Sequence, residues 1–198
     1  MEIKPARRIC VFCGSNQGNR TVFRETAAGL GRELVARGYG LVYGGGNVGL
    51  MNVIANAVLA AGGVAIGVIP SALVDKEVAH RGLTELRVVT SMHERKAVMA
   101  ELADGFLALP GGIGTMEELF EVLSWAQLGL HDKPCGLLDV DRYYQPLLGF
   151  LDGGVATGFI KPKHRALLIV ESDAGNLLDR FEEKWRARSP KPFDATIT

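Results

Sequence analysis

A strand, a glycine loop and the start of a helix follow one another in residues 107–118, which read Leu107-Ala108-Leu109-Pro110-Gly111-Gly112-Ile113-Gly114-Thr115-Met116-Glu117-Glu118. The first apolar residues have the composition of a buried strand, and the glycines end it before a helical pattern begins. Amide N–H groups at a helix start attract anions, and glycines let a phosphate approach them closely. Two carboxylates stand in the first predicted turn. The segment therefore predicts a phosphate site beside an acid, which indicates chemistry on a phosphorylated small molecule.

The same alternation of strand and helix extends over most of the chain. Strands are predicted at 9–13, 40–43, 64–69, 85–89, 105–109, 135–138 and 167–170, and helices at 20–37, 48–61, 92–103, 115–128, 143–156 and 174–186. Continuous apolar strands separated by such helices predict an α/β fold, a doubly wound, Rossmann-like parallel sheet of about seven strands with helices on both faces. Ligands of these sheets bind outside the carboxyl ends of the strands, so the glycine loops should converge there.

Length and composition predict one domain over residues 1–198, with a loose tail at 189–198. The chain has 198 residues, of which 47% are hydrophobic, and its 22 basic and 22 acidic residues cancel. A neutral protein has no long-range field that draws it to nucleic acid or an anionic membrane. No signal peptide or membrane span is recognisable, because the longest apolar run is broken by glycines and Asn56. We expect a cytoplasmic protein that binds neither nucleic acid nor membranes.

The cysteines and histidines indicate no metal site. Cys10, Cys13 and Cys135 cannot form a disulfide framework, and the C-x-x-C of the first two lies in a predicted strand. Residues three apart on a strand point to opposite faces, so core packing is favoured over a redox or metal role. The four histidines lie far apart without a ligand pattern.

A second glycine loop, at residues 44–49, reads Gly44-Gly45-Gly46-Asn47-Val48-Gly49 and matches G-x-G-x-x-G. A dinucleotide site also needs an acid at the end of the next strand, about 20 residues on, to hold the ribose. That strand ends in Pro70-Ser71, and the first acid is Asp75, which disfavours NAD or FAD. Two interpretations stay open: the glycines allow tight strand-to-helix packing, or Gly44, Gly45 and Gly46 contact the phosphate or ribose of a mononucleotide.

Glu118 and Arg95 each allow a structural interpretation. Thr115 and Glu118 have the spacing of a T-x-x-E capping box, although an ordinary cap does not need the glycines before it. Arg95 falls on the apolar stripe of the helix 92–103, where a guanidinium must find an anion, pair with an acid or reach the rim. Lys96, about 100° further round, is expected to be a solvated surface charge unless the helix start faces a ligand.

Four motifs together resemble the LOG family, the cytokinin riboside 5′-monophosphate phosphoribohydrolases, long described as lysine-decarboxylase-like. They lie at 44–51, at 77–86, at Ser91-Met92-His93-Glu94-Arg95-Lys96, and at 110–118. The resemblance extends over roughly residues 8 to 185, and the combination is highly specific. It implies a Rossmann-like homodimer that cleaves the N-glycosidic bond of a nucleoside 5′-monophosphate, releasing free base and ribose 5-phosphate. It implies no redox or pyridoxal cofactor.

The resemblance also implies roles for individual residues. Arg95 and Glu118 would be the catalytic pair. The implied substrate contacts, besides Arg95, are Glu77, Lys96, Gly111, Gly112, Ile113, Gly114, Thr115, Met116, Glu117 and Ser124. Two positions depart from the family pattern, Asn52 after Gly-Leu-Met and Asn56 in place of the aspartate of Ala-Asp-Ala. They leave the base preference open.

A mechanism follows as a hypothesis. Breaking a ribosyl C–N bond builds positive charge on the sugar, which Glu118 could stabilise while it steers a water molecule. Arg95 could donate a hydrogen bond to the leaving base or orient Glu118, and the phosphate held at 111–115 would position the sugar. Two alternatives remain: a general AMP or purine 5′-monophosphate nucleosidase, and a non-hydrolytic nucleotide-binding carrier. Only the pairing of Arg95 with Glu118 separates the enzyme from the carrier.

Overall fold

Seven parallel strands form one sheet at the centre of the computed structural model, which describes residues 5–74 and 79–187. Their order across the sheet is β4-β3-β2-β1-β5-β6-β7. The strands are β1 (Arg7–Phe12), β2 (Tyr39–Tyr43), β3 (Ala65–Pro70), β4 (Glu85–Val89), β5 (Gly105–Ala108), β6 (Cys135–Leu138) and β7 (Leu168–Glu171). Glu77 and the predicted tail at 189–198 lie outside the described residues.

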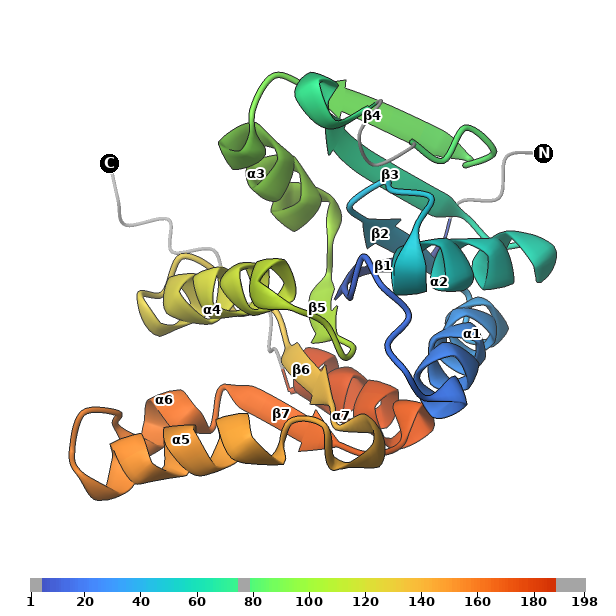
Figure 1. The fold of residues 1–198 in the computed structure, drawn as a ribbon. Coiled ribbons are helices and arrows are strands. Elements are labelled where there is room, and N and C mark those ends of the chain that lie inside the picture. Colours follow the sequence, from blue (N-terminus) through green and yellow to red (C-terminus); the bar gives the residue numbers. More distant parts are fainter. Residues whose placement is uncertain (1–4, 75–78, 188–198) are drawn as a thin grey trace.

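Helices cover both faces of the sheet (Figure 1). One face carries α1 (Thr21–Ala36), α2 (Gly49–Ala60) and α7 (Ala174–Arg186), and the other carries α3 (Met92–Leu102), α4 (Ile113–Gln127), α5 (Gln145–Ala156) and the single turn α6 (Pro162–Arg165). Two short 3-10 segments, η1 (Ser71–Leu73) and η2 (Val140–Arg142), follow β3 and β6. The predicted doubly wound α/β fold of about seven parallel strands is therefore confirmed.

The positions of the predicted elements agree with the structure to within about two residues at most ends. The shift at the start of α4 matters for function, because the helix begins at Ile113 instead of 115. The predicted helix at 143–156 begins at Gln145, after η2, and α6 was not predicted. In the described ranges, no helix is both long and apolar enough to cross a bilayer.

The order of strands creates a switch point between β1 and β5. β1 pairs with β2 on one side and with β5 on the other, so the connections leaving these two strands lead to helices on opposite faces. The loops after β1 and β5 therefore diverge at the carboxyl edge of the sheet, where ligands of such folds bind. They remain in contact at their bases, since the Gly14 N–H donates to the Pro110 carbonyl at 3.1 Å.

The cysteines lie where the strand geometry predicts. Cys10 packs with the core on the α3 and α4 side, and Cys13 packs with the core on the α1 and α2 side. The two therefore point to opposite faces, as predicted. Cys135 is also a buried free thiol.

The buried thiols should resist alkylation in the native protein. Burial raises the pKa of Cys10 and Cys13 well above the ordinary thiol range and that of Cys135 to about 12, so all three stay protonated at pH 8. Iodoacetamide labelling followed by mass spectrometry should be more than about a hundredfold slower than in urea, because the thiolate is the nucleophile. Rapid native labelling of any of the three would contradict this placement.

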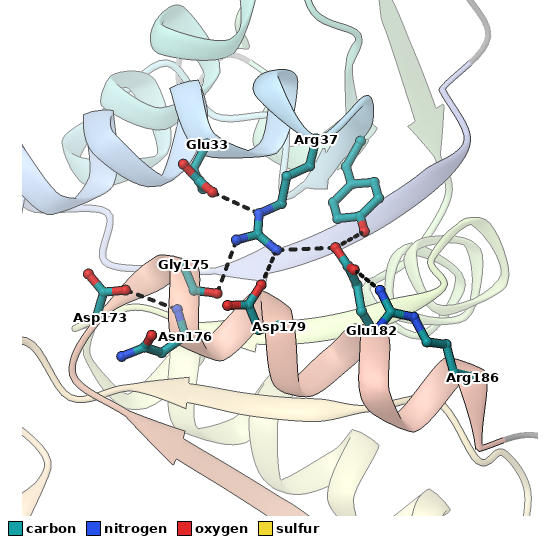
Figure 2. Close-up of polar contacts among 9 residues, drawn as sticks. Glu33, Arg37, Asp173, Gly175, Asn176, Asp179, Glu182 and Arg186 are labelled. Carbon is teal, nitrogen blue, oxygen red and sulfur yellow. Dashed lines mark hydrogen bonds and ion pairs between the residues drawn. The ribbon is translucent and has the colours of Figure 1, made fainter.

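Arg37 joins the end of α1 to the start of α7 (Figure 2). Its guanidinium is largely buried, with a side chain that is 20% exposed. Burial alone lowers its pKa, but the hydrogen bonds and charges of Glu33 and Asp179 outweigh burial and raise it. The guanidinium donates to Glu33 Oε1 at 2.7 Å, Asp179 Oδ1 at 2.6 Å, Glu182 Oε1 at 3.1 Å and the Gly175 carbonyl at 3.3 Å.

Replacing Arg37 should destabilise the fold. Arg37→Met should lower the free energy of unfolding in urea by about 2 kcal/mol, because several charge-assisted hydrogen bonds are lost together. Arg186→Met is the matched control, since the Arg186 side chain is 76% exposed and pairs with Glu182 alone among the described acids. Its effect should stay within about 0.5 kcal/mol. Equal shifts for the two variants would exclude a special role for Arg37.

Candidate active site

The glycine loop between β5 and α4 ends in an open helix start. Gly112 caps α4 with extended backbone, no side chain caps the helix, and a Cβ on Gly112 or Gly114 would meet nothing within 4 Å. Gly111 is the tight position, because its Cβ would lie 2.1 Å from Thr115 Oγ1 and 2.8 Å from the Gly14 nitrogen. The start of α4 is thus open around Gly112 and Gly114, and the first N–H groups of a helix are suited to bind an anion.

The predicted capping box is wrong. Because the extended backbone of Gly112 starts α4 early, Thr115 is the third helical residue, and it is only 4% exposed. Its side chain fills the space beneath Gly111 and caps nothing. The first turn of α4 carries no acid, so Glu117 and Glu118 lie in the second turn, one turn later than predicted. Glu118 therefore does not serve as the acid of that cap.

The loop after β2 makes room for Arg95. Arg95 Nη2 donates to the Gly44 carbonyl at 3.2 Å, and a Cβ on Gly44 would lie 1.8 Å from that nitrogen. Gly45 has a positive φ of 75° and packs against β3, and its carbonyl accepts from the His80 N–H at 3.0 Å. Gly46 forms a bridge with Ala79. Gly45 therefore allows tight packing against the neighbouring strand, which is one of the two interpretations left open by the sequence. Gly44 has a different role, because its missing side chain leaves room for the guanidinium of Arg95.

Arg95 is buried at the start of α3. Its relative exposure is 6%, so it does not reach out to solvent. Besides the bond to Gly44, its Nη1 lies 3.7 Å from Met92 Sδ, and its Nε is buried without a hydrogen-bond partner in the described part of the chain. A buried cation with an unsatisfied donor is costly unless an anion or a ligand acceptor completes its contacts.

Arg95 and Glu118 both influence the pKa of the buried Cys10 thiol. The pKa of the Cys10 thiol is raised first by burial and then by the charge of Glu118, and it is lowered by the charge of Arg95. Glu118 also raises the pKa of Cys13, after burial. Both charged groups therefore act on Cys10 in β1, and of the two only Glu118 acts on Cys13, which follows β1. The helices that carry the predicted pair, α3 and α4, cover the same face of the sheet.

Lys96 is not a solvated surface charge, contrary to the expectation. Its side chain is 11% exposed, and its Nζ lies 2.5 Å from Glu117 Oε1 and 2.9 Å from Glu121 Oε1. Burial lowers the pKa of Lys96, but the two carboxylates of α4 outweigh it and raise the pKa overall. The reason is tertiary: α3 packs close enough to α4 for the ion pair to form. Lys96 thereby ties the helix of Arg95 to the helix of Glu118.

The other predicted contacts are scattered. Ile113 is 90% exposed at the start of α4, and Met116 packs partly into the core against β6 and α5. Ser124 lies about 16 Å further along the helix at 1.5 Å per residue. It lines a cavity of about 120 Å³ between α4 and α5, so the structure does not bring it to the glycine loops.

A cavity of about 220 Å³ at the switch point was missed from the sequence. It adjoins the glycine loop from the α1 side, whereas Arg95 and Glu118 approach from the α3 and α4 side and do not line it. One sequence feature could have indicated this cavity: a polar, glycine-containing run follows β1 directly and lies at the same edge of the sheet as the glycine loops. The lining residues include Gly14, Ser15, Asn16, Gln17, Gly18, Phe23, Gly111, Gly112 and Tyr143.

The two asparagines that depart from the family pattern form a chain of hydrogen bonds with His80. The Gly82 N–H donates to His80 Nδ1 at 3.2 Å, so that ring nitrogen carries no proton. His80 Nε2 therefore donates to Asn56 Oδ1 at 3.0 Å, and Asn56 Nδ2 donates to Asn52 Oδ1. The asparagines thus anchor the segment that pairs with Gly45 and Gly46. Among the described residues, no three His, Cys, Asp or Glu side chains are grouped as a metal site requires.

Comparison with known proteins identifies the family. A profile described as "Possible lysine decarboxylase" matches residues 51–181. The rice (Oryza sativa subsp. japonica) protein named Probable cytokinin riboside 5'-monophosphate phosphoribohydrolase LOGL1 is 55% identical over 180 residues, which cover 91% of this chain and 81% of that protein. Cytokinin riboside 5'-monophosphate phosphoribohydrolase LOG3 of Arabidopsis thaliana is 50% identical over 183 residues, covering 92% and 85%. The chain belongs to the LOG family.

Some solved structures of other proteins resemble this LOG-family chain in fold alone. The molybdenum cofactor carrier protein of Chlamydomonas reinhardtii has a TM-score of 0.66 at 22% identity, covering 92% of this chain and 99% of that one. The molybdenum cofactor binding protein of Rippkaea orientalis has a TM-score of 0.67 at 22% identity, covering 91% and 96%. Because proteins that share a fold can differ in chemistry, the function of the LOG-family chain must be argued from its site.

Proposed function

We propose that the chain hydrolyses the N-glycosidic bond of N6-substituted adenosine 5′-monophosphates and thereby activates cytokinins. The products are the free base and ribose 5-phosphate. The proposal is supported by the 50 to 55% identity to relatives with that name over about nine-tenths of the chain. The single observation that carries it in the structure is the buried guanidinium of Arg95, which is held by the Gly44 carbonyl and whose Nε has no hydrogen-bond partner among residues 5–74 and 79–187.

The phosphate would bind at the open start of α4. In this arrangement the N–H groups of Gly112, Ile113, Gly114 and Thr115 donate to its oxygens, aided by the helix dipole. The absence of side chains at Gly112 and Gly114 leaves that approach open. Binding energy from the phosphate then positions the sugar for reaction, so the free nucleoside should be a poor substrate.

Glu118 and Arg95 would carry the chemistry at the sugar. Water forms the new C1′–O bond while the C1′–N bond breaks and its electron pair leaves with the base. Glu118 stabilises the positive charge on the sugar and takes a proton from the water, and the departing base takes up a proton from solvent to become the free base. Arg95 keeps its own proton because its pKa exceeds about 12, and it donates a hydrogen bond to the leaving base or to Glu118. Neither step requires a cofactor.

The remaining implied contacts would complete the substrate site. Gly44 borders Arg95, and together with Gly45 and Gly46 it would face the ribose. Lys96 would act mainly through its ion pairs with Glu117 and Glu121, which join α3 to α4. Glu77, the last implied contact, lies outside the described residues.

A substrate panel tests the proposed reaction. Purified protein is incubated with AMP, GMP, CMP and N6-isopentenyl AMP, and the free base is measured by chromatography. Release from N6-isopentenyl AMP several-fold faster than from AMP supports the cytokinin-activating assignment. Equal rates on AMP and GMP would replace it with a general purine 5′-monophosphate nucleosidase, and tight binding without base release would replace it with a carrier.

We also propose a homodimer that acts in the cytoplasm. Ile113 and Phe120, seven residues apart on α4, expose 90% and 36% of their surface, and Leu128 after the helix exposes 71%. Apolar side chains along one helix face are typical of subunit interfaces. Light scattering should give twice the mass of one chain, and Phe120→Asp should shift it toward the monomer. The three buried free thiols suit a reducing compartment.

A further inference from the structure

The carbonyl groups of the glycine loop before α4 are each tied to a donor. The Leu109 carbonyl accepts from the Tyr144 hydroxyl at 2.6 Å, and the Pro110 carbonyl accepts from the Gly14 N–H at 3.1 Å. The Gly112 carbonyl accepts the first helical bond, from the Met116 N–H at 3.1 Å. Between them, the Gly111 carbonyl accepts from the Tyr143 hydroxyl at 2.7 Å.

These bonds fix the direction of the amides. In a trans peptide the carbonyl and the next N–H point in opposite directions, and the described chain contains no cis peptide bond. Holding the Gly111 carbonyl on Tyr143 therefore aims the Gly112 N–H away from Tyr143. Without that bond the peptide between two glycines can rotate easily and present its carbonyl to an anion, which repels it.

Tyr143 is held in place by costly backbone geometry. It follows Asp141 and Arg142, which have left-handed φ values of 53° and 61° although neither is glycine. Such strain persists only where the surroundings enforce it, and it is typical of functional sites. Here Asp141 pairs with Arg20 of the loop after β1, and the Tyr143 ring packs edge-on against Phe23 at 5.8 Å.

Tyr143 and Tyr144 differ in their surroundings. Tyr144 is 2% exposed, and its N–H donates to Asp139 Oδ1 at 2.7 Å, so it belongs to the core. Tyr143 is 44% exposed and lines the cavity beside Gly111 and Gly112. Because Tyr143 is half-exposed and its hydroxyl bonds the carbonyl between the two glycines, it contributes more to the orientation of the loop than to the core.

We propose that Tyr143 is a positioning residue for the phosphate: it holds the Gly111 carbonyl out of the anion site and so sets the affinity for phosphorylated ligands. This inference rests on the proposed function, because it assumes that the start of α4 binds the 5′-phosphate. The strained segment and the bond from Arg20 to Asp141 keep the tyrosine against the loop.

Calorimetric binding of ribose 5-phosphate to Tyr143→Phe tests this role. The variant keeps the aromatic contacts with Phe23 and Tyr144 and removes only the hydroxyl. The Kd for ribose 5-phosphate should rise about five- to tenfold, as for one lost hydrogen bond. In turnover, KM for the nucleoside 5′-monophosphate should rise by the same factor while kcat stays within about twofold. Adenosine, which lacks the phosphate, should bind with unchanged affinity.

Tyr39→Phe is the matched control. The Tyr39 hydroxyl also makes a hydrogen bond, at 2.8 Å to Glu182 Oε1, but at the beginning of β2 and far from the loop. This variant should bind ribose 5-phosphate as the parent protein does. An unchanged Kd for Tyr143→Phe, an equal loss for Tyr39→Phe or for adenosine, or no binding of ribose 5-phosphate by the parent protein would overturn the role. If the expected losses occur but no base is released from any monophosphate, the hydrolase proposal fails and the role of Tyr143 stands.

Discussion

Glu118→Gln should lower kcat for nucleoside 5′-monophosphate hydrolysis about a hundred- to a thousandfold, with little change in KM. The variant keeps the size and shape of the side chain and removes the charge that would stabilise the sugar cation and accept a proton. Because α4 begins at Ile113 with Gly112 at its N-cap, Glu118 lies beyond the third helical position, where the acid of a capping box stands. Initial rates of base release, measured over a range of substrate concentrations, separate kcat from KM.

The matched control for Glu118 is Glu101→Gln. Glu101 is exposed near the end of α3, and the same chemical change there should leave the rate within about twofold of the parent rate. Thermal melting of both variants checks that the fold is intact. Turnover by Glu118→Gln close to that of the control would return Glu118 to a purely structural role.

Gly44→Ala should reduce hydrolysis about a hundredfold, which is a typical loss when a catalytic group is displaced by about 1 Å. The backbone of Gly44 does not have a positive φ, so alanine is conformationally allowed there. The new Cβ would, however, lie 1.8 Å from Arg95 Nη2 and would force the buried guanidinium to move. The effect is measured as kcat/KM for the monophosphate.

A double-mutant cycle isolates the cause of the Gly44 effect. If Gly44→Ala acts by displacing Arg95, adding it to Arg95→Met should cause little further loss, and the two effects should not add. Gly149→Ala, in α5 with nothing within 4 Å of its Cβ, is the control for glycine replacement and should be fully active. Additive losses in the cycle would show that Gly44 acts independently of Arg95.

Elements with strong local signals could be predicted from the sequence. The apolar runs of β1, β2 and β3 and the helical patterns between them specify a parallel sheet without help from distant contacts. The alternation of strand residues alone predicts that Cys10 and Cys13 lie on opposite faces of the sheet. Arg95 was recognisable because a cation on an apolar stripe is unusual, and the structure indeed buries it.

Features that depend on the packing of distant segments could not be predicted. The T-x-x-E spacing at Thr115 indicated a cap, but the extended backbone of Gly112 starts the helix earlier and turns Thr115 inward. Lys96 was expected in solvent because its partners, Glu117 and Glu121, lie on another helix. The contact of Tyr143 with Gly111 joins residues 32 positions apart, and no local pattern signals it.

A crystal structure of the Glu118→Gln variant with a bound nucleoside 5′-monophosphate tests the central claim most directly. We expect the phosphate on the N–H groups at the start of α4, with C1′ facing the side chain at position 118 and the base within reach of Arg95. A phosphate bound elsewhere, with residue 118 turned away from the sugar, would contradict it.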